Sequence, residues 1–449
     1  MNENTNCMAT SELKVEQEKC LTNSAGDTNG TQTVKVTLAI DHTTDNDENR
    51  GTSSVAELPT ADYVKLQKHP VSCDSASPEE KDWLDRRNQI LASLYGQCVG
   101  DAIGLLSEFM NRHQAKYHYG LREELEYHHK YEDFHRSRWA EGDWTDDSDH
   151  MILIMESLTE NNGLVVKTNF AQKMVNWMKH GFQDLGDLGG MGIGSTTLHT
   201  LRHKDFLKDP HKVAEEVWIF GKKDVAPNGG VMRTSILGIH DWWDTDQVVK
   251  NALEICKTTH RDPRCQASAV SVCVAISLML QRIHYSNGEY NIPDLINSVY
   301  KYAKKCLDSR KKKKSLKSYL ECKDLSELDL DEAHSLGYTY KCLGAGFWAL
   351  KQNNFRDALQ QIVMHAGDAD TNGAVAGALL GCKLGHFDKI PSTWLSKLKH
   401  KDWLDGKIEK YFAILKRRYL SKDEHEKDTN ELIARSHEAA LIIEPSEKK

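Results

Sequence analysis

The sequence predicts an all-α protein, because apolar residues recur at helical spacing through most of the chain while strand-like alternation is scarce. From Trp83 to about Tyr419, successive stretches carry hydrophobic residues three or four positions apart, which places their side chains on one face of a helix. Only 9 prolines interrupt the 449 residues. We therefore expect a compact multi-helix domain.

The expected helices follow one another along the chain. Their apolar rows are Leu84–Leu91–Leu94–Tyr95–Cys98–Val99–Ala102, then Met151–Ile152–Met155–Leu158, then Val270–Val274–Leu278, and then Leu343–Phe347–Trp348–Leu350. The longest apolar stretch, residues 267–280, contains three serines and is too short to cross a bilayer, so we expect a buried helix. A later helix carries small residues at Ala374, Gly377, Ala378 and Gly381, which predicts a closely packed neighbour.

Composition divides the chain into three parts. Residues 1–80 are polar and poor in aromatics, so we expect a disordered extension. The predicted domain covers residues 81–420 and includes a lysine-rich insertion near 301–325, and a polar tail follows at 421–449. The run RKKKK within that insertion suits a nuclear-import signal or polyanion patch on the one hand, or a solvated surface segment on the other. We favour the solvated segment because short basic runs are common.

Charge and cysteine usage narrow the class of protein. The formal net charge of -8 argues against nucleic acid or anionic membranes as partners. The 11 cysteines are scattered, with no C-x-x-C pair, so we expect reduced thiols rather than a disulfide framework. The start of the chain has no apolar signal segment. We therefore expect a cytoplasmic monomer, with the nucleus as the alternative location.

Two acidic clusters carry the strongest chemical signal. WTDDSD at residues 144–149 and GDADT at residues 367–371 each lie where a loop leads into a predicted helix. Carboxylate and hydroxyl oxygens that converge on one point suit hard cations such as Mg²⁺ or Mn²⁺. The alternative is helix capping, because Asp, Ser and Thr are favoured at helix N-termini. Clustered carboxylates repel without a cation or a proton, and capping one helix needs only one of them.

Four weaker motifs accompany these clusters. They are GDAIG at 100–104 with Glu108 following, the glycine-rich loop GGMGIGSTT at 189–197, APNGGVMR at 226–233 and THRDP at 259–263. The glycine-rich loop is similar to phosphate-binding loops that precede a helix, but it has no Walker lysine and no preceding strand. Taken singly, each motif has an ordinary structural interpretation as a surface loop, a turn or a structural histidine.

Together and in this order, the motifs resemble the ADP-ribosylglycohydrolase family. The matching segments are GDAIGLLSEFM, WTDDSDHMIL, GGMGIGSTTL, APNGGVMRTSILGI, THRDP and HAGDADTNGAVAGALLG. The resemblance implies an all-helical fold with two metal ions, Mg²⁺ or Mn²⁺. It places metal ligands at Thr145, Asp146, Asp147, Asp368, Asp370 and Thr371. It places the family's metal-proximal glutamate at Glu108 and substrate contacts at Gly192, Gly194, Ser195, Asn228, Gly229 and His260.

The expected reaction is hydrolysis of the glycosidic bond between ADP-ribose and a protein side chain or small acceptor, with Asp146 or Glu108 as the general base. Two other functions stay open: a non-catalytic ADP-ribose-binding or structural protein on the same fold, and a metal-dependent phosphohydrolase of ADP-ribose-like nucleotides. The acceptor also stays open, since the sequence from Arg261 to Arg264 differs from the familiar animal members. The N-terminal extension and the lysine-rich insertion are not part of the family core.

Overall fold

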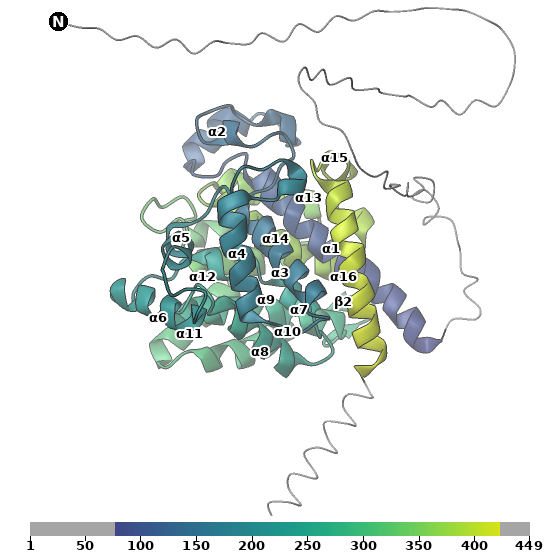
Figure 1. Ribbon diagram of the computed structural model, residues 1–449. Coiled ribbons are helices and arrows are strands. Elements are labelled where there is room, and N and C mark those ends of the chain that lie inside the picture. The colour runs from purple at the N-terminus through teal and green to yellow at the C-terminus, as the bar shows by residue number, and fades with distance from the viewer. Residues whose placement is uncertain (1–76, 423–449) are drawn as a thin grey trace, which may run out of the picture. The chain divides into compact units, whose positions relative to one another are not determined.

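The computed structural model describes residues 77–422, and within that range it contains 16 α-helices, seven short 3-10 helices and one two-stranded antiparallel hairpin. The predicted all-α fold is confirmed (Figure 1). The α-helices are α1 (Pro78–Gly104), α2 (Arg112–Tyr119), α3 (Asp146–Glu160), α4 (Lys167–His180), α5 (Ser195–Leu201), α6 (Pro210–Phe220), α7 (Ser235–Ile239), α8 (Thr245–Cys256), α9 (Pro263–Leu280), α10 (Ile292–Ala303), α11 (Arg310–Leu320), α12 (Thr339–Ala349), α13 (Phe355–His365), α14 (Ala369–Leu384), α15 (Ser392–Ser396) and α16 (Lys401–Leu420).

The remaining regular elements are short. The 3-10 helices are η1 (Tyr127–His129), η2 (Arg136–Arg138), η3 (Gln183–Leu185), η4 (Asn228–Gly230), η5 (Lys304–Cys306), η6 (Leu325–Leu328) and η7 (Phe387–Lys389). Strands β1 (Tyr285–Ser286) and β2 (Glu289–Tyr290) form the hairpin, with Tyr285 opposite Tyr290. The hairpin contributes little to the core, because three of its four residues are exposed.

Helices α1 and α14 pack with their backbones in direct contact at the centre of the domain (Figure 1). Each presents glycines four residues apart toward the other: Gly96, Gly100 and Gly104 on α1, and Gly373, Gly377 and Gly381 on α14. A Cβ added to Gly100 would lie 2.0 Å from the carbonyl oxygen of Gly373, so only glycine fits there. The neighbour predicted for the small residues of α14 is therefore α1, and the contact draws Asp101 toward Asp370.

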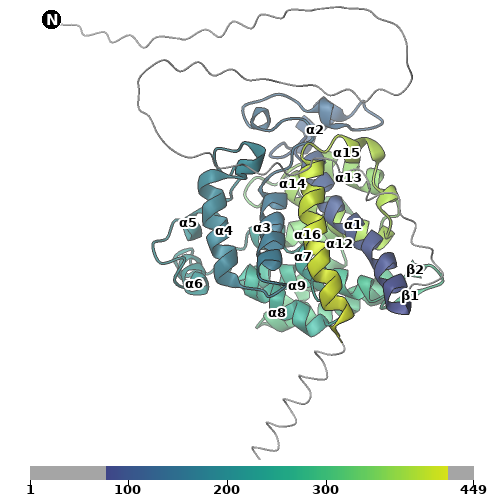
Figure 2. The same cartoon turned by 45° about the vertical axis from the view of Figure 1, so that its right-hand side comes forward.

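Helix α9 is the core helix predicted for residues 267–280. Every residue from Ala267 to Leu280 is buried, and α7, α8, α10 and α12 pack around it. Among residues 77–422, α9 alone is long and apolar enough to resemble a membrane span, but 83% of it is buried inside the fold, as a core helix would be. On another side of the domain, α4, α3 and α16 lie in a row (Figure 2).

The lysine run forms a helix of its own. Ser309 caps α11 by accepting a hydrogen bond from the backbone N–H of Lys312 at 3.3 Å, and α11 packs against α12. Leu316 and Leu320 are fully buried, while Lys311 and Lys314 are exposed. The run is therefore one solvated face of a packed helix.

The predicted extension at 1–80 and tail at 421–449 lie almost entirely outside the described residues. At the two ends of the described range, α1 begins at Pro78, shortly before the predicted boundary, and α16 ends at Leu420. Ser77 and Glu80 form a capping box, in which each side chain accepts a hydrogen bond from the other residue's backbone N–H, and this fixes the start of α1.

Candidate active site

The two acidic clusters occupy the first turns of α3 and α14. Thr145 is the N-cap residue of α3, and Asp146 and Asp147 follow in its first turn. Asp368 is the N-cap residue of α14, and Asp370 lies in its first turn. Neither N-cap side chain accepts a hydrogen bond from its own helix. Helix capping therefore does not account for the two clusters.

The cap of α3 comes instead from α1. The Asp101 carboxylate accepts hydrogen bonds from the backbone N–H groups of Thr145 and Ser148, both at 3.0 Å, and from both of their hydroxyls. Asp101 is fully buried. Sequence reasoning noticed Asp101 but gave it no role; the available signal was a carboxylate among the buried apolar residues Cys98, Val99 and Ala102.

The two clusters form a single site. The Thr145 hydroxyl lies 3.2 Å from Asp147 Oδ2 and 3.3 Å from Asp370 Oδ2, and the Thr371 hydroxyl donates to the same Asp147 oxygen at 3.2 Å. Carboxylate oxygens group in two overlapping triads, each with its atoms within 4.8 Å of one another: Asp101, Asp147 and Asp370, and Glu108, Asp368 and Asp370. Asp370 belongs to both triads and so links them.

The electrostatics of this site favour a cation. Burial raises the pKa of Asp146, Asp147 and Asp370 well above the usual range, and repulsion from neighbouring carboxylates adds to the effect. Burial also raises the pKa of Asp101, to about 7, although the hydrogen bonds from Ser148 and Thr145 oppose the rise. Asp147 Oδ1 is buried and accepts no hydrogen bond from the described residues. Several carboxylates, two threonine hydroxyls and an unpartnered buried oxygen fit a hard divalent cation.

A cavity of about 130 Å³ opens above these carboxylates. Its wall includes the following predicted site residues: Glu108, Asp146, Asp147, Gly192, Gly194, Ser195, Asn228, Gly229, His260, Asp368, Asp370 and Thr371. The remaining predicted residue, Thr145, is only 2% exposed and does not line the cavity, but contacts Asp147 and Asp370. The structure thus brings every predicted residue to one place, while their individual roles stay predictions.

The glycine-rich loop passes close to the acids. Gly192 has a φ of 86°, a left-handed conformation that favours glycine, and an added Cβ would lie 2.5 Å from Asp146 Oδ1. A side chain at this position would therefore displace the Asp146 carboxylate. Gly194 and Ser195 continue the cavity wall at the start of α5.

Asn228 and His260 complete the wall. The Asn228 amide donates a hydrogen bond to Asp368 Oδ2 at 2.7 Å. The His260 ring contacts the Thr259 hydroxyl through Nδ1 at 2.7 Å, and that hydroxyl accepts a hydrogen bond from the buried Arg233 at 2.6 Å. Burial, together with the charge of Arg233, lowers the pKa of His260 well below the usual range. The His260 ring is therefore neutral.

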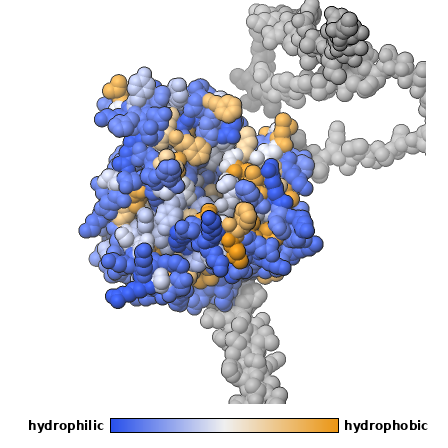
Figure 3. Space-filling model, turned by 90° about the vertical axis from the view of Figure 1, so that its left-hand side faces the viewer, coloured by the Kyte–Doolittle hydropathy of each residue, from blue (hydrophilic) through white to orange (hydrophobic). Residues whose placement is uncertain are grey.

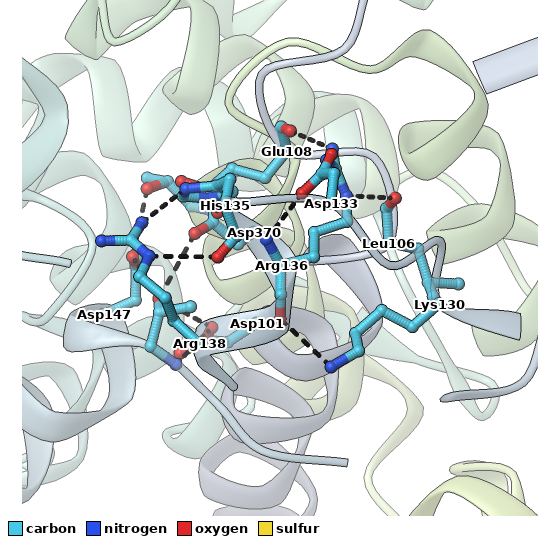
Figure 4. Close-up of polar contacts among 12 residues, drawn as sticks. Asp101, Leu106, Glu108, Lys130, Asp133, His135, Arg136, Arg138, Asp147 and Asp370 are labelled. Atoms are coloured by element: carbon cyan, nitrogen blue, oxygen red, sulfur yellow. Dashed lines mark hydrogen bonds and ion pairs between the residues drawn. The ribbon is translucent and has the colours of Figure 1, made fainter. Parts of the chain in front are cut away.

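Glu108 has a partner that the motifs did not predict. His135 Nε2 lies 2.6 Å from Glu108 Oε2, and Arg138 Nη2 lies 2.5 Å from Nδ1 of the same ring (Figure 4). Burial raises the pKa of Glu108, while the hydrogen bond from His135 opposes the rise. The only sequence feature that pointed to His135 was the group of histidines and arginines at residues 128–138, whose spacing matches no known motif.

A second cavity, of about 600 Å³, adjoins the first. The two share Ser195, Thr196, Pro227 and His260, and the larger one extends over α6 to Trp218 and Phe220. Phe220 is 92% exposed. Figure 3 views the side of the molecule that carries α6, where hydrophobic patches interrupt a largely hydrophilic surface. The small acidic cavity thus continues into a wider, mainly apolar one.

Comparisons with known proteins agree with this arrangement. The chain is 26% identical to the ADP-ribosylarginine hydrolase Tri1 of Pseudomonas putida, over 72% of this chain and 76% of the relative. It is 24% identical to the ADP-ribosyl-[dinitrogen reductase] glycohydrolase of Rhodospirillum rubrum, over 70% and 91%. A solved ADP-ribosylglycohydrolase-related protein complex shares the fold, with a TM-score of 0.53 at 21% identity over 74% of this chain and 99% of that one. The family model for ADP-ribosylglycohydrolase matches residues 82–424, so the chain belongs to the ADP-ribosylglycohydrolase family of hydrolases.

Proposed function

We propose that this protein uses divalent cations to hydrolyse the glycosidic bond between ADP-ribose and a modified protein side chain or small acceptor. The supporting observation is the convergence of acids from α3, α14 and the turn after α1 with the glycine-rich loop, Asn228 and His260 around one cavity. The proposed cofactor is two Mg²⁺ ions, with Mn²⁺ as the alternative. The proposed ligands are Thr145, Asp146, Asp147, Asp368, Asp370 and Thr371.

When bound, the cations would supply positive charge that orients the ribose hydroxyls and a water molecule and lowers the pKa of that water. Asp147 and Asp370 are suited to hold them, because each lies in the first turn of a helix and contacts a threonine hydroxyl. Asn228 orients Asp368 through its amide hydrogen bond. The ring of carboxylate oxygens would stabilise positive charge that develops on the ribose as the glycosidic bond breaks.

Either Asp146 or Glu108 would take the proton of the attacking water. Asp146 lies on the cavity wall, and its carboxylate accepts no hydrogen bond from residues 77–422. Glu108 also faces the cavity, but one of its oxygens already contacts His135. Because no described residue holds the Asp146 carboxylate, one of its oxygens could serve as the proposed cation ligand while the other takes the proton, which makes Asp146 the stronger candidate for the general base.

The adjoining cavity would hold the rest of ADP-ribose. The acidic cavity, at about 130 Å³, is too small for a dinucleotide-sized ligand, whereas the adjoining one measures about 600 Å³. Ser195 and His260 lie on both walls, so a ligand that passes them would span the two. Its adenosine end would then lie against the apolar wall that includes Trp218.

The decisive experiment incubates the purified protein with Mg²⁺ and a panel of arginine-, serine- and O-acetyl-linked ADP-ribose conjugates. Free ADP-ribose as the product supports glycosidic cleavage, and the substrate that turns over identifies the acceptor. Release of AMP or phosphate would instead support the phosphohydrolase alternative. ADP-ribose binding without turnover of any conjugate would support the non-catalytic alternative.

A pair of matched variants ties activity to this cavity. Asp146→Asn should lower kcat by about 10²- to 10⁴-fold, the usual contribution of a general base. Asp388→Asn makes the same chemical change at an exposed position beyond α14 and should keep full activity. Equal activity in the two variants would contradict the proposed role of Asp146.

A further inference from the structure

Glu108 is held by a segment that lies outside every motif that predicted the site. The segment runs through η1 and η2, and it contacts both the side chain and the backbone of the turn that follows α1. His135 Nε2 lies 2.6 Å from Glu108 Oε2, and the two side chains are only 20% and 8% exposed. This is the single hydrogen bond to the Glu108 carboxylate among residues 77–422, so Oε1 is free for another partner.

Arg138 determines which nitrogen of His135 carries the proton. Its Nη2 lies 2.5 Å from His135 Nδ1, and a guanidinium can only donate hydrogen bonds. Nδ1 must therefore accept, and the proton of the neutral ring lies on Nε2, where it points at Glu108. Arg138 also donates through Nε to the backbone oxygen of His135 at 3.0 Å, and its guanidinium lies over the Trp139 ring. The His135 ring is thus held from two sides.

The same segment anchors the backbone around Glu108. The buried Arg136 donates to the carbonyl oxygen of Leu106 at 2.9 Å and to that of Glu108. The next residue, Phe109, has a φ of 60°, a conformation that is strained for a non-glycine residue. The ring centroids of Phe109 and His135 lie 4.9 Å apart. The backbone N–H of Phe109 donates a hydrogen bond to the carbonyl oxygen of Gly367, just before α14. Such a turn persists only when its surroundings hold it in place.

From these contacts we propose that His135, supported by Arg138, is a positioning residue that holds Glu108 with one oxygen directed to the cation site. His135 would not touch the substrate, and it would act through the Glu108 carboxylate. The inference rests on the proposed function only in assuming that Glu108, Asp368 and Asp370 face a bound cation. A partner that hydrogen bonds to a metal-site carboxylate typically accounts for about 10- to 100-fold in metal affinity or activity.

Two substitutions at His135 separate hydrogen bonding from packing. His135→Phe keeps a ring against Phe109 and Trp139 but removes the donor to Glu108. His135→Gln keeps an amide donor near the position of Nε2. His128→Phe is the matched control, because His128 is exposed in the same segment and its one described contact is with the neighbouring His129 ring.

The primary readout is Mn²⁺ affinity measured by calorimetry on the full-length protein, which needs no substrate. His135→Phe should weaken Mn²⁺ binding and lower kcat by about 10- to 100-fold each, with a smaller change in KM. His135→Gln should retain most of the Mn²⁺ affinity and most of kcat, and the control His128→Phe should match wild type. Arg138→Met alone should reduce Mn²⁺ affinity and kcat by less than His135→Phe does. Added to His135→Phe, it should cause no further reduction, because Arg138 and His135 act through the same Glu108 carboxylate.

Wild-type affinity in His135→Phe would overturn the inference. A His135→Gln variant as impaired as His135→Phe would also overturn it, since ring packing would then explain the loss. If His135→Phe fails to fold, as judged by melting in chelator, His135→Gln and Arg138→Met still decide the question. Wild-type protein that binds no Mn²⁺ or Mg²⁺ would instead reject the proposed cation site, and the inference with it.

Discussion

The hydroxyl of Thr145 lies 3.3 Å from the carboxylate of Asp370, although 225 positions separate the two residues in the chain. Two features produce this contact. The glycine rows of α1 and α14 let those helices touch, and Asp101 on α1 caps the start of α3. The ends of α1, α3 and α14 that carry the acidic residues therefore meet. The site depends on the packing of α1 against α14 as much as on the carboxylates themselves.

Replacing Gly100 with alanine tests that dependence. The new Cβ would lie 2.0 Å from the backbone oxygen of Gly373, so α1 and α14 must separate. Overpacking of this kind costs about 1–3 kcal/mol of unfolding free energy, which urea denaturation would measure. We also expect lower activity, because the separation would displace Asp101.

Gly406→Ala is the matched control for that variant. Gly406 lies within α16, where an added Cβ meets no atom of residues 77–422 within 4 Å. Alanine is favoured over glycine in helices by about 1 kcal/mol, so this variant should be as stable as wild type or more stable. Equal free energies of unfolding for Gly100→Ala and Gly406→Ala would show that the close packing of α1 against α14 does not contribute to stability.

Asp101→Ala should destabilise the protein even when chelator removes all cations. The variant loses the four hydrogen bonds that the carboxylate accepts from Thr145 and Ser148, two of which cap α3. Loss of a helix cap costs about 0.5–2 kcal/mol, and the buried Ser148 hydroxyl would also lose its acceptor, whereas the Thr145 hydroxyl keeps Asp147 and Asp370 within reach. Asp101→Asn keeps one acceptor oxygen and should lose less. Urea unfolding with EDTA measures both, and an unaffected Asp101→Ala would show that the cap contributes nothing.

Without cations, the acidic cluster should contribute less stability as the pH rises. The pKa of Asp101 is about 7 in the folded protein against an ordinary value of 3.8, and burial also raises the pKa of Asp146 and Asp370. A carboxyl with a raised pKa binds its proton more tightly in the folded state. Its stabilising contribution is complete below the unfolded pKa and disappears as the pH passes the folded pKa.

The measurement is a series of thermal melts in chelator from about pH 5 to about pH 8, where each unit of pKa elevation corresponds to about 1.4 kcal/mol. The buried His260, whose pKa is lowered, changes stability in the opposite sense but equally with and without cations. The melting temperature in chelator should therefore fall across this window relative to that in saturating Mg²⁺, because cations bind the ionised carboxylates. A difference between the two conditions that shrinks toward pH 8 would contradict the proposed electrostatics of the site.

The lysine run should be dispensable for catalysis. Replacing Lys311, Lys313 and Lys314 with glutamine removes three charges but keeps helix propensity, and none of these residues lines the acidic cavity. We expect kcat and KM equal to those of wild type on a small conjugate. A large loss of kcat, with the melting temperature unchanged, would show that α11 takes part in the reaction.

The fold could be predicted from local patterns, and most of the cavity from the family resemblance that the motifs carry together. Apolar periodicity predicted the helices, and the glycine-rich loop, Asn228 and His260 line the acidic cavity as the resemblance implied. The roles of Asp101 and His135 could not be predicted in this way. Asp101 caps a helix 44 residues away, and His135 contacts Glu108 from a segment with no regular spacing. Contacts of that kind depend on how helices pack, which no local pattern records.

The central claim, that Asp370 joins both acidic triads at a cation site, is tested most directly by thermal melts of wild type and Asp370→Asn, each with Mg²⁺ and with chelator. In chelator the variant should be as stable as wild type or more stable, because one repelling charge is removed from a buried cluster. With Mg²⁺, wild type should gain stability by binding the ion, and the variant should gain much less. Equal destabilisation of the variant with and without Mg²⁺, with hydrolysis retained, would contradict the cation site.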